Sequence, residues 1–302
     1  MAGKFDCTAE VRERISSLDI DKEIYVTGAA GDATEYVRRR CKTAVNEPLR
    51  FYACGGDGTL NEVVSGAVGF GNVEVACVPV GSGNDYVKYY GGAEAFSDMR
   101  RIVSGKAMPV DVMRVETLVA GEKMGGIHYS INICNFGFDA AVCRTMEQVR
   151  RKKIIGGRNA YTTGIVKALF TSRRTRCRIT VDSTLMHDGD ILLCTLGNGR
   201  YVGGSYQCSP LSLNDDGLIE VCLFKPMSIV SFARLIGSYR DGTFMQREDV
   251  QDKMTYLRGK TVEIEAPTEI DLCVDGEMLL GSHFRIEELP QALHFIAPTH
   301  QN

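Results

Sequence analysis

The sequence lacks the features that would place it in a membrane or in an oxidising compartment. None of its apolar runs approaches the roughly 20 residues that a bilayer-spanning helix needs. The beginning of the chain is charged and has no apolar core of a secretory signal peptide. The 11 cysteines include no Cys-x-x-Cys pair, and several lie within apolar runs, which predicts reduced core residues and neither disulfides nor a zinc site. We therefore expect a cytoplasmic protein whose contact with a membrane is peripheral.

Two common nucleotide-binding motifs and a basic surface are also absent. No Gly-x4-Gly-Lys-Ser/Thr sequence occurs, and the dinucleotide fingerprint fails at its third glycine, where Tyr86 stands. The net charge of −3 does not predict a nucleic-acid-binding protein. There is no fixed-period repeat and no low-complexity segment.

What is present is an ordinary globular composition, 44% hydrophobic and 24% charged, in a chain of 302 residues long enough for two domains. Strand-like and helical patterns alternate over the first ~110 residues, which predicts a parallel α/β sheet. In such sheets, ligands bind at the carboxyl ends of the strands. The predicted strands are 23–27, 51–54 and 73–80, and the predicted helices are 10–18, 33–41 and 96–104.

After Asp111 the pattern changes to short strand-like runs separated by turn signals, which predicts an antiparallel sheet or sandwich. We expect an α/β nucleotide-binding domain over residues 1–111 and a larger β-rich domain over 112–286, with 287–302 packing back on the first. The strand-like runs are 112–118, 128–135, 177–181, 190–197, 218–224, 261–265, 271–274 and 292–296, and helical patterns occur near 161–170 and 228–240.

The most informative stretch is a glycine loop at residues 55–58 between a predicted strand and a predicted helix. We place the helix N-cap at Thr59, with Glu62 completing a capping box. Backbone N–H groups at such a helix start bind phosphate, and glycines let the backbone approach closely. A carboxylate at Asp57 would repel phosphate, which indicates either a bridging Mg²⁺ or a proton to be moved. The alternative is an ordinary Asp-Gly turn.

Four further Gly/Asp clusters follow, at residues 81–85, 197–204, 214–217 and 275–277. The second glycine loop, 81–85, also leaves a predicted strand, so both loops should face one cleft. Taken singly, the last two clusters are typical of hairpin turns.

In this order, the clusters resemble the diacylglycerol-kinase catalytic family, which includes the bacterial soluble lipid kinases and the sphingosine and ceramide kinases. The matching motifs are Gly-Gly-Asp-Gly-Thr at 55–59, Pro-Val-Gly-Ser-Gly-Asn-Asp at 79–85 (with Ser82 where Thr is usual), Pro-Val-Asp at 109–111, residues 132–139, 197–204 and 214–218, and Val-Asp-Gly-Glu at 274–277. The resemblance covers nearly the whole chain and agrees with the two domains expected from the pattern.

The resemblance implies transfer of the γ-phosphate of ATP to a lipid hydroxyl, most of all that of diacylglycerol, with Mg²⁺ as cofactor. It implies Glu277 as the proton acceptor, and Asp85, Asp111 and Asn84 as polar groups around Mg²⁺ and its waters. The nucleotide-binding residues that it implies are Thr27, Gly56, Asp57, Gly58, Thr59 and Ser82. It also implies a structural metal site made by the Asp216 carboxylate and the backbone carbonyls of Leu213 and Leu218, oxygen ligands that suit Mg²⁺ or Ca²⁺.

The sequence departs from the family at its beginning, where a buried strand normally ends in Asn-Pro-x-x-Gly-Lys. Here Met1-Ala-Gly-Lys4 resembles only the tail of that motif, and Lys4 is a candidate for the family lysine. Either the start codon lies too far downstream or the first strand has been lost. A chain extended upstream in frame is expected to encode an apolar strand and to bind ATP more tightly.

Two basic clusters, at 150–153 and 173–178, are either solvated faces or surfaces for anionic lipid headgroups. The second alternative predicts a peripheral membrane protein that acts in lipid metabolism. Two rival functions stay open: an NAD-kinase-like phosphotransferase, and a non-catalytic lipid-binding or regulatory homologue. Whether the chain forms a homodimer is also left open.

Overall fold

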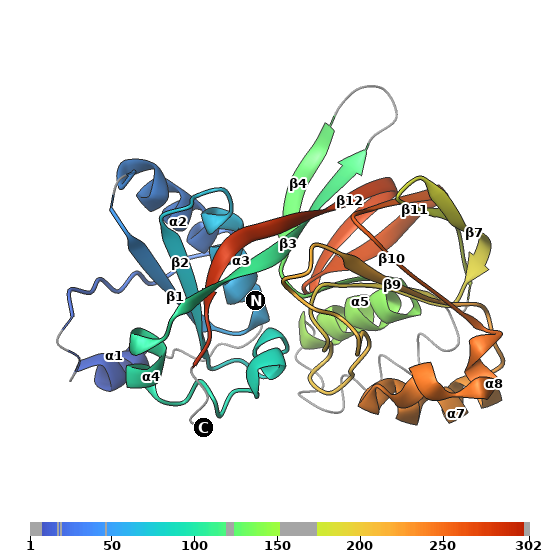
Figure 1. Cartoon of the computed structure of the whole chain (residues 1–302), viewed down its shortest axis with the longest axis horizontal. Coiled ribbons are helices and arrows are strands. Elements are labelled where there is room, and N and C mark those ends of the chain that lie inside the picture. The colour runs from blue at the N-terminus through green and yellow to red at the C-terminus, as the bar shows by residue number, and fades with distance from the viewer. Residues whose placement is uncertain are drawn as a thin grey trace.

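The computed structural model describes residues 8–16, 18, 20–45, 47–118, 124–151 and 174–298, which form two lobes joined by long strands (Figure 1). The helices are α1 (Thr8–Ser16), α2 (Asp32–Thr43), α3 (Asp57–Ala67), α4 (Met99–Ser104), α5 (Phe138–Arg151), α7 (Ile229–Asp241) and α8 (Glu248–Gln251), with 3₁₀ turns η1 (Tyr86–Tyr90) and η2 (Thr243–Gln246). The strands are β1 (Leu49–Gly55), β2 (Val73–Pro79), β3 (Ala107–Leu118), β4 (Met124–Ser130), β5 (Ile133–Gly137), β6 (Thr175–Val181), β7 (Thr184–Ile191), β8 (Leu193–Gly197), β9 (Ile219–Phe224), β10 (Met254–Gly259), β11 (Thr261–Val274) and β12 (Glu277–Ile296).

The N-terminal lobe is a small parallel sheet with helices packed against it, as the alternating pattern predicts. β1 pairs with β2 in parallel, and each strand is followed by a glycine loop at its carboxyl end. Helix α2 buries Ala33, Val37 and Cys41, which lie four residues apart on one helical face. Helix α3 buries Leu60, Val63, Val64 and Ala67 in the same core.

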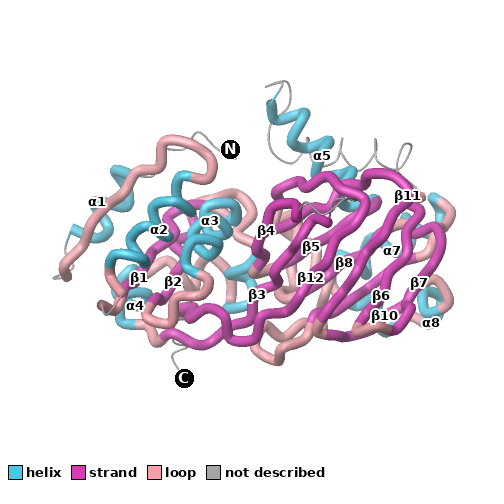
Figure 2. The backbone as a smooth tube through the Cα atoms, turned by 90° about the horizontal axis from the view of Figure 1, so that it is seen from above, coloured by secondary structure: helices cyan, strands magenta, loops and turns pink. Residues whose placement is uncertain are grey.

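The C-terminal lobe is antiparallel and β-rich, and its helices lie on the outside of the sheet (Figure 2). The strands β5, β8, β9 and β10 follow one another in the sheet, and β6 and β7 form a hairpin beside β11. One core cluster fills the space between these strands, and a second lies between the sheet and helices α5 and α7.

Strands β3 and β12 connect the two lobes (Figure 1). β12 pairs antiparallel with β11 and β3, and its last residues, His294 to Ile296, pair in parallel with β2. The register of β12 against β3 shifts between Leu289 and Leu293, where Gln291 has a φ of 53°. This irregularity changes the direction of the strand. The predicted domain boundary at residue 111 stays a prediction, because β3 passes through it without a break.

Most predicted elements are present, but residues 23–27 do not form a strand. They are irregular and largely exposed, and they line the same cleft as β1 without pairing with it. A strand needs a hydrogen-bonded partner to satisfy its backbone groups. β1 ends the sheet, but within the described part of the chain no backbone hydrogen bond joins residues 23–27 to it. The predicted strand at 128–135 is divided into β4 and β5, the one at 190–197 falls across β7 and β8, and 261–265 and 271–274 are parts of a single strand, β11. The predicted helix at 161–170 lies outside the described residues.

The predicted cap of α3 is also wrong. The N-cap is Gly56, three residues before the predicted Thr59, and the helix begins at Asp57, because Leu60 N–H already donates to the carbonyl of Gly56. Glu62 makes no capping box; its carboxylate accepts from Ala33 N–H (3.1 Å) and so joins α2 to α3.

Residues 214–217 form a turn before β9 but no hairpin, since no strand immediately precedes them.

Candidate active site

The two glycine loops touch each other at the carboxyl ends of β1 and β2. A Cβ atom added at Gly81 would lie 2.4 Å from the Cα of Gly56, and one added at Gly83 would lie 2.7 Å from a carboxylate oxygen of Asp57. Contacts that short do not occur between real atoms, so this approach requires glycine. The sequence-based expectation that the loops share one cleft is therefore correct.

The side chain of Asp57 joins the two loops by a direct hydrogen bond. Its Oδ1 accepts from the backbone N–H of Asp85 (2.6 Å). Burial, and then the nearby charge of Asp85, raise the pKa of Asp57 to about 6. A carboxyl group with this pKa can be neutral or ionised near physiological pH. Its protonated form does not repel a neighbouring phosphate.

Asp85 reaches the other lobe. Its carboxylate accepts from the backbone N–H of Gly204 (2.9 Å to Oδ1) and forms an ion pair with Lys88 (2.5 Å). Gly204 lies in the third predicted Gly/Asp cluster, so this hydrogen bond crosses the cleft between the lobes. Asn84, the preceding residue, has a φ of 50° and its Nδ2 donates to the carbonyl of Gly81 (2.7 Å). This local bond stabilises the left-handed conformation of Asn84.

Asp275 holds the β11–β12 hairpin against both lobes. The backbone N–H groups of Ile131 (2.9 Å), Asn132 (3.2 Å) and Ile133 (2.9 Å) donate to its carboxylate, as does Ser130 Oγ (2.7 Å). Asn61 Nδ2, from helix α3, adds a fifth donor (3.0 Å). The side chain is half-buried, and burial raises its pKa. Asp275 is therefore a structural anchor.

Glu277 begins β12, two residues beyond this anchor, and is exposed to the cleft. A Cβ atom added at Gly58 would lie 3.9 Å from Glu277 Oε1, so the carboxylate is adjacent to the first glycine loop. The predicted hairpin at 275–276 is confirmed, with φ values of 47° at Asp275 and 96° at Gly276. The hairpin thus serves to bring Glu277 to the loop.

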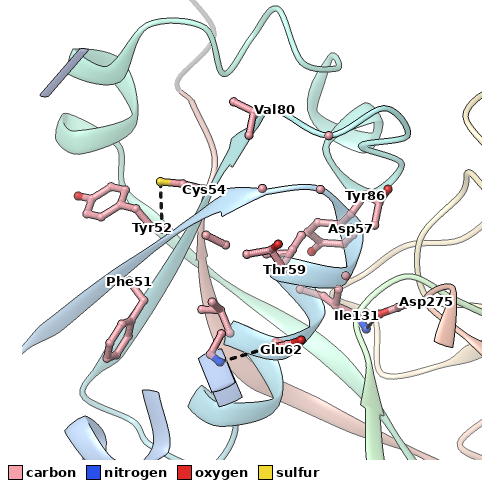
Figure 3. Close-up of a pocket in the computed structure, with 18 of the residues that line it drawn as sticks. Phe51, Tyr52, Cys54, Asp57, Thr59, Glu62, Val80, Tyr86, Ile131 and Asp275 are labelled. Carbon is pink, nitrogen blue, oxygen red and sulfur yellow. Dashed lines mark hydrogen bonds between the residues drawn. The ribbon is translucent and has the colours of Figure 1, made fainter. Parts of the chain in front are cut away.

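These groups line a cleft of about 2410 Å³ between the lobes. Figure 3 shows Asp57 and Thr59 at the start of α3, with Ile131 and Asp275 on the facing side. Eight of the predicted site residues line it: Thr27, Gly56, Asp57, Gly58, Thr59, Ser82, Asp85 and Glu277. Asn84 lies within the second loop, behind this surface.

Asp111 lies elsewhere, beside the turn at residues 213–218. Its Oδ2 accepts from Gly217 N–H (2.6 Å) and its Oδ1 from Gln291 N–H (2.7 Å). Its carboxylate therefore has two backbone partners and does not line the cleft. The structure places it with Asp216, the predicted structural metal ligand, and apart from Asp85.

At the predicted metal site of Leu213, Asp216 and Leu218, the Asp216 carboxylate already has partners within the protein. Asp216 accepts from Leu218 N–H (3.1 Å) and pairs with Arg258. Within the described part of the chain, no three His, Cys, Asp or Glu side chains are close enough to share an ion. A site built largely from backbone carbonyls does not need such a cluster.

Glu288 was missed by the sequence reasoning. It is 4% exposed, and burial, followed by the charges of Asp111 and Asp216, raises its pKa to about 8. Asn61 was not singled out either, and Gly204 was identified only as part of the 197–204 cluster. No sequence signal distinguishes these residues, because their roles depend on contacts across more than 100 positions.

The second basic cluster is neutralised within its own hairpin. Across β6 and β7, Arg176 and Arg178 pair with Asp188 (3.4 and 2.8 Å), and Arg174 lies 3.7 Å from Asp190. These exposed pairs support the solvated-face alternative for residues 174–178. The side chains of the first cluster, 150–153, lie outside the described residues. In the ranges that the structure describes, we find no helix with the length and hydropathy of a membrane span.

The described cysteines agree with the sequence-based prediction. Eight of the ten described cysteines are buried. They are small apolar core residues.

The fold and the cleft define a two-lobed protein in which glycine loops of an α/β lobe face acidic and amide groups of a β-rich lobe. Two family models cover the chain: the diacylglycerol kinase catalytic domain matches residues 2–115, and the YegS C-terminal NAD kinase beta sandwich-like domain matches residues 132–297. The chain belongs to the family that joins these two domains.

Relatives match along almost their whole length. A protein of Serratia proteamaculans (strain 568) named "Probable lipid kinase YegS-like" is 29% identical, over 98% of this chain and 92% of the relative. One of Escherichia coli O1:K1 / APEC named "Probable lipid kinase YegS" is also 29% identical, over 98% and 94%. The crystal structure of a diacylglycerol kinase from Bacillus anthracis str. Sterne has a TM-score of 0.66 at 21% identity, over 98% and 93% of the two chains. That similarity confirms the predicted fold.

Proposed function

We propose that this chain, a lipid kinase by its family, transfers the γ-phosphate of ATP to the hydroxyl of diacylglycerol or a related membrane alcohol. The observation that carries the proposal is the position of Glu277 against the first glycine loop, 3.9 Å from where a Cβ of Gly58 would lie. The nucleotide lobe supplies phosphate-binding backbone, and the other lobe supplies a carboxylate next to it.

In this reaction the lipid hydroxyl oxygen attacks the γ-phosphorus, the bond from that phosphorus to the bridging oxygen breaks, and ADP leaves. Glu277 accepts the proton of the hydroxyl. The backbone N–H groups at the start of α3 bind the phosphates, aided by the positive end of the helix dipole. The remaining catalysis comes from positioning and from neutralising charge.

Mg²⁺ suits the carboxylates that face these loops. Asp57 and Asp85 are the candidates to hold it, because both reach the junction of the glycine loops. When bound, Mg²⁺ neutralises charge on the transferring phosphate. A second cation suits the turn of Leu213, Asp216 and Leu218, where Asp111 lies close by. Peripheral contact with an anionic membrane is part of the proposal, since the substrate resides in a membrane.

The test is a radiolabelled-ATP assay of the purified chain with diacylglycerol, sphingosine, ceramide, phosphatidylglycerol and NAD offered separately. We expect label in a lipid, with diacylglycerol the preferred acceptor. Label in NAD alone would overturn the proposal in favour of an NAD kinase. Binding of ATP with no transfer to any acceptor would favour a non-catalytic homologue.

A further inference from the structure

The turn at residues 213–218 lies where three distant parts of the chain meet. Asp111 comes from β3, Gly217 donates to it from the turn, and Gln291 donates to it from β12. The backbone N–H of Asp111 in turn donates to the carbonyl of Asn214 (2.8 Å). The turn is therefore fixed to both strands that connect the lobes.

Glu288, on β12, is buried beside this turn without a partner for its charge. Neither of its carboxylate oxygens has a hydrogen-bond partner among the described residues, and the side chain is 96% enclosed. Glu288 pairs with Met113 on β3, two residues from Asp111, and a Cβ atom added at Gly217 would lie 3.5 Å from Pro290, so this part of β12 lies against the turn. Buried carboxylates normally have several donors, so an unpartnered one indicates a missing cationic partner.

The protein supplies too little positive charge for this group of acids. Arg258 pairs with Asp216, but it also lies 2.7 Å from the fully buried carboxylate of Glu220. Its single charge is thus divided between two carboxylates. Asp111 takes two backbone N–H groups, which carry no net charge, and Glu288 takes none. Asp111, Asp216 and Glu220, counted as ionised, exceed the charge of Arg258 by two even before Glu288 is counted.

We propose that Glu288 is the second carboxylate of the cation site at the Leu213–Asp216–Leu218 turn. A hard divalent cation there, Mg²⁺ or Ca²⁺, would have the Asp216 and Glu288 carboxylates and backbone carbonyls as oxygen ligands. Held in this way, the cation joins the turn to β12 next to the point where that strand leaves one lobe for the other. The inference rests on the cation site of the proposed function, but not on the kinase reaction.

The experiment compares wild type with Glu288→Gln, and uses Glu287→Gln as the matched control. Glu287 is the neighbouring residue on the same strand; its side chain is 40% exposed and lies 3.7 Å from Arg114. Each chain is stripped with EDTA and then titrated with Mg²⁺ and with Ca²⁺, by calorimetry and by thermal melts. We expect Glu288→Gln to bind at least about tenfold more weakly than wild type, and Glu287→Gln to bind like wild type.

The metal-free melts give an independent readout. Without a cation, Glu288→Gln should melt at or above the wild-type temperature, because the amide removes a buried, unpartnered acid. With saturating cation the order should reverse. Glu288→Asp keeps the charge but is one methylene shorter, so it should bind the cation with intermediate affinity.

Two outcomes separate the possibilities. An Mg²⁺ titration of Glu288→Gln equal to that of wild type overturns the proposal while leaving the cation site intact. If wild type shows no response to either cation, and Asp216→Ala melts like wild type, both the cation site and the role of Glu288 are overturned. The kinase reaction is unaffected by either result, since it is tested by lipid phosphorylation.

Discussion

At the scale of single residues, two acids two positions apart have opposite roles. Asp275 is half-buried and accepts five hydrogen bonds, whereas Glu277 is exposed to the cleft beside Gly58. The two side chains carry the same formal charge, so charge alone does not predict this difference in role. Their surroundings predict that substitution of one affects stability and that substitution of the other affects chemistry.

Replacing Glu277 with Gln should reduce lipid phosphorylation by at least about two orders of magnitude, because the amide keeps size and hydrogen bonding but cannot accept a proton. ATP affinity and melting temperature should stay near wild type. The measurement is steady-state turnover with calorimetric ATP binding. A variant that retains half of the wild-type rate would remove Glu277 from the mechanism and make Asp85 the next candidate.

Replacing Asp275 with Asn should instead destabilise the fold, by roughly 3 kcal/mol. Each carboxylate oxygen accepts from at least two donors, so either orientation of the amide sets an NH₂ group against N–H or O–H donors. The left-handed backbone at this position tolerates Asn, so the turn itself is not the cause. Urea unfolding measures the loss; an unchanged midpoint would contradict the anchoring role.

At the scale of elements, the site depends on two strand-loop-helix units whose loops approach to backbone contact. Gly56 belongs to the loop after β1 and Gly81 to the loop after β2. Since β1 and β2 are parallel and in register, their carboxyl ends necessarily meet at one edge. The distance between the loops, however, is set by the absence of side chains.

Replacing Gly81 with Ala should separate the loops. The new methyl group would lie 2.4 Å from the Cα of Gly56 and 3.0 Å from its N, and backbone atoms cannot move aside cheaply. We expect a stability loss of about 1–3 kcal/mol and an ATP affinity reduced roughly tenfold or more. Gly71→Ala is the control, because nothing lies within 4 Å of a Cβ there. Equal ATP affinity in both variants would refute the close-approach argument.

At the scale of the whole molecule, several buried carboxyl groups make global stability depend on pH. Burial raises the pKa of Asp139 to about 6, although the hydroxyl of Tyr239 donates to it (2.8 Å). A raised pKa means that the folded state holds the proton more tightly than the unfolded state. The resulting stabilisation is complete below about pH 4 and is lost as pH rises towards 6.

Asp139→Asn should therefore flatten the pH dependence of the unfolding free energy between about pH 4 and 6, by up to about 3 kcal/mol. Urea unfolding across pH 4–8 measures it. Asp241→Asn is the control, since the hydroxyl of Thr243 lowers the pKa of Asp241 and its effect falls below about pH 4 with the opposite sign. If Asp139→Asn followed the wild-type curve, the buried carboxyl would not be the source.

Much of the architecture could be predicted from the sequence because it depends on local patterns. The apolar spacing of α2 and α3, the alternation of strands and helices up to Asp111 and the Asp-Gly hairpin at 275–276 each result from interactions within a few residues. The order of the glycine motifs was enough to indicate the family. Where local signals were ambiguous, as at Thr59, the predicted helix cap was off by three residues.

Tertiary structure alone decided which of the predicted site residues share a cleft. Asp111 and Asp85 have similar sequence signals, yet one accepts from Gly217 and the other from Gly204. Residues 23–27 have a strand pattern but pair with no described strand, and Glu288, which the sequence did not single out, is buried by the strands around it. The reason is that pattern reports which face a residue occupies, whereas burial and pairing depend on chain segments up to 200 positions away. The sequence by itself therefore determined the chemistry available to this protein, and the packing of its two lobes determined where each group acts.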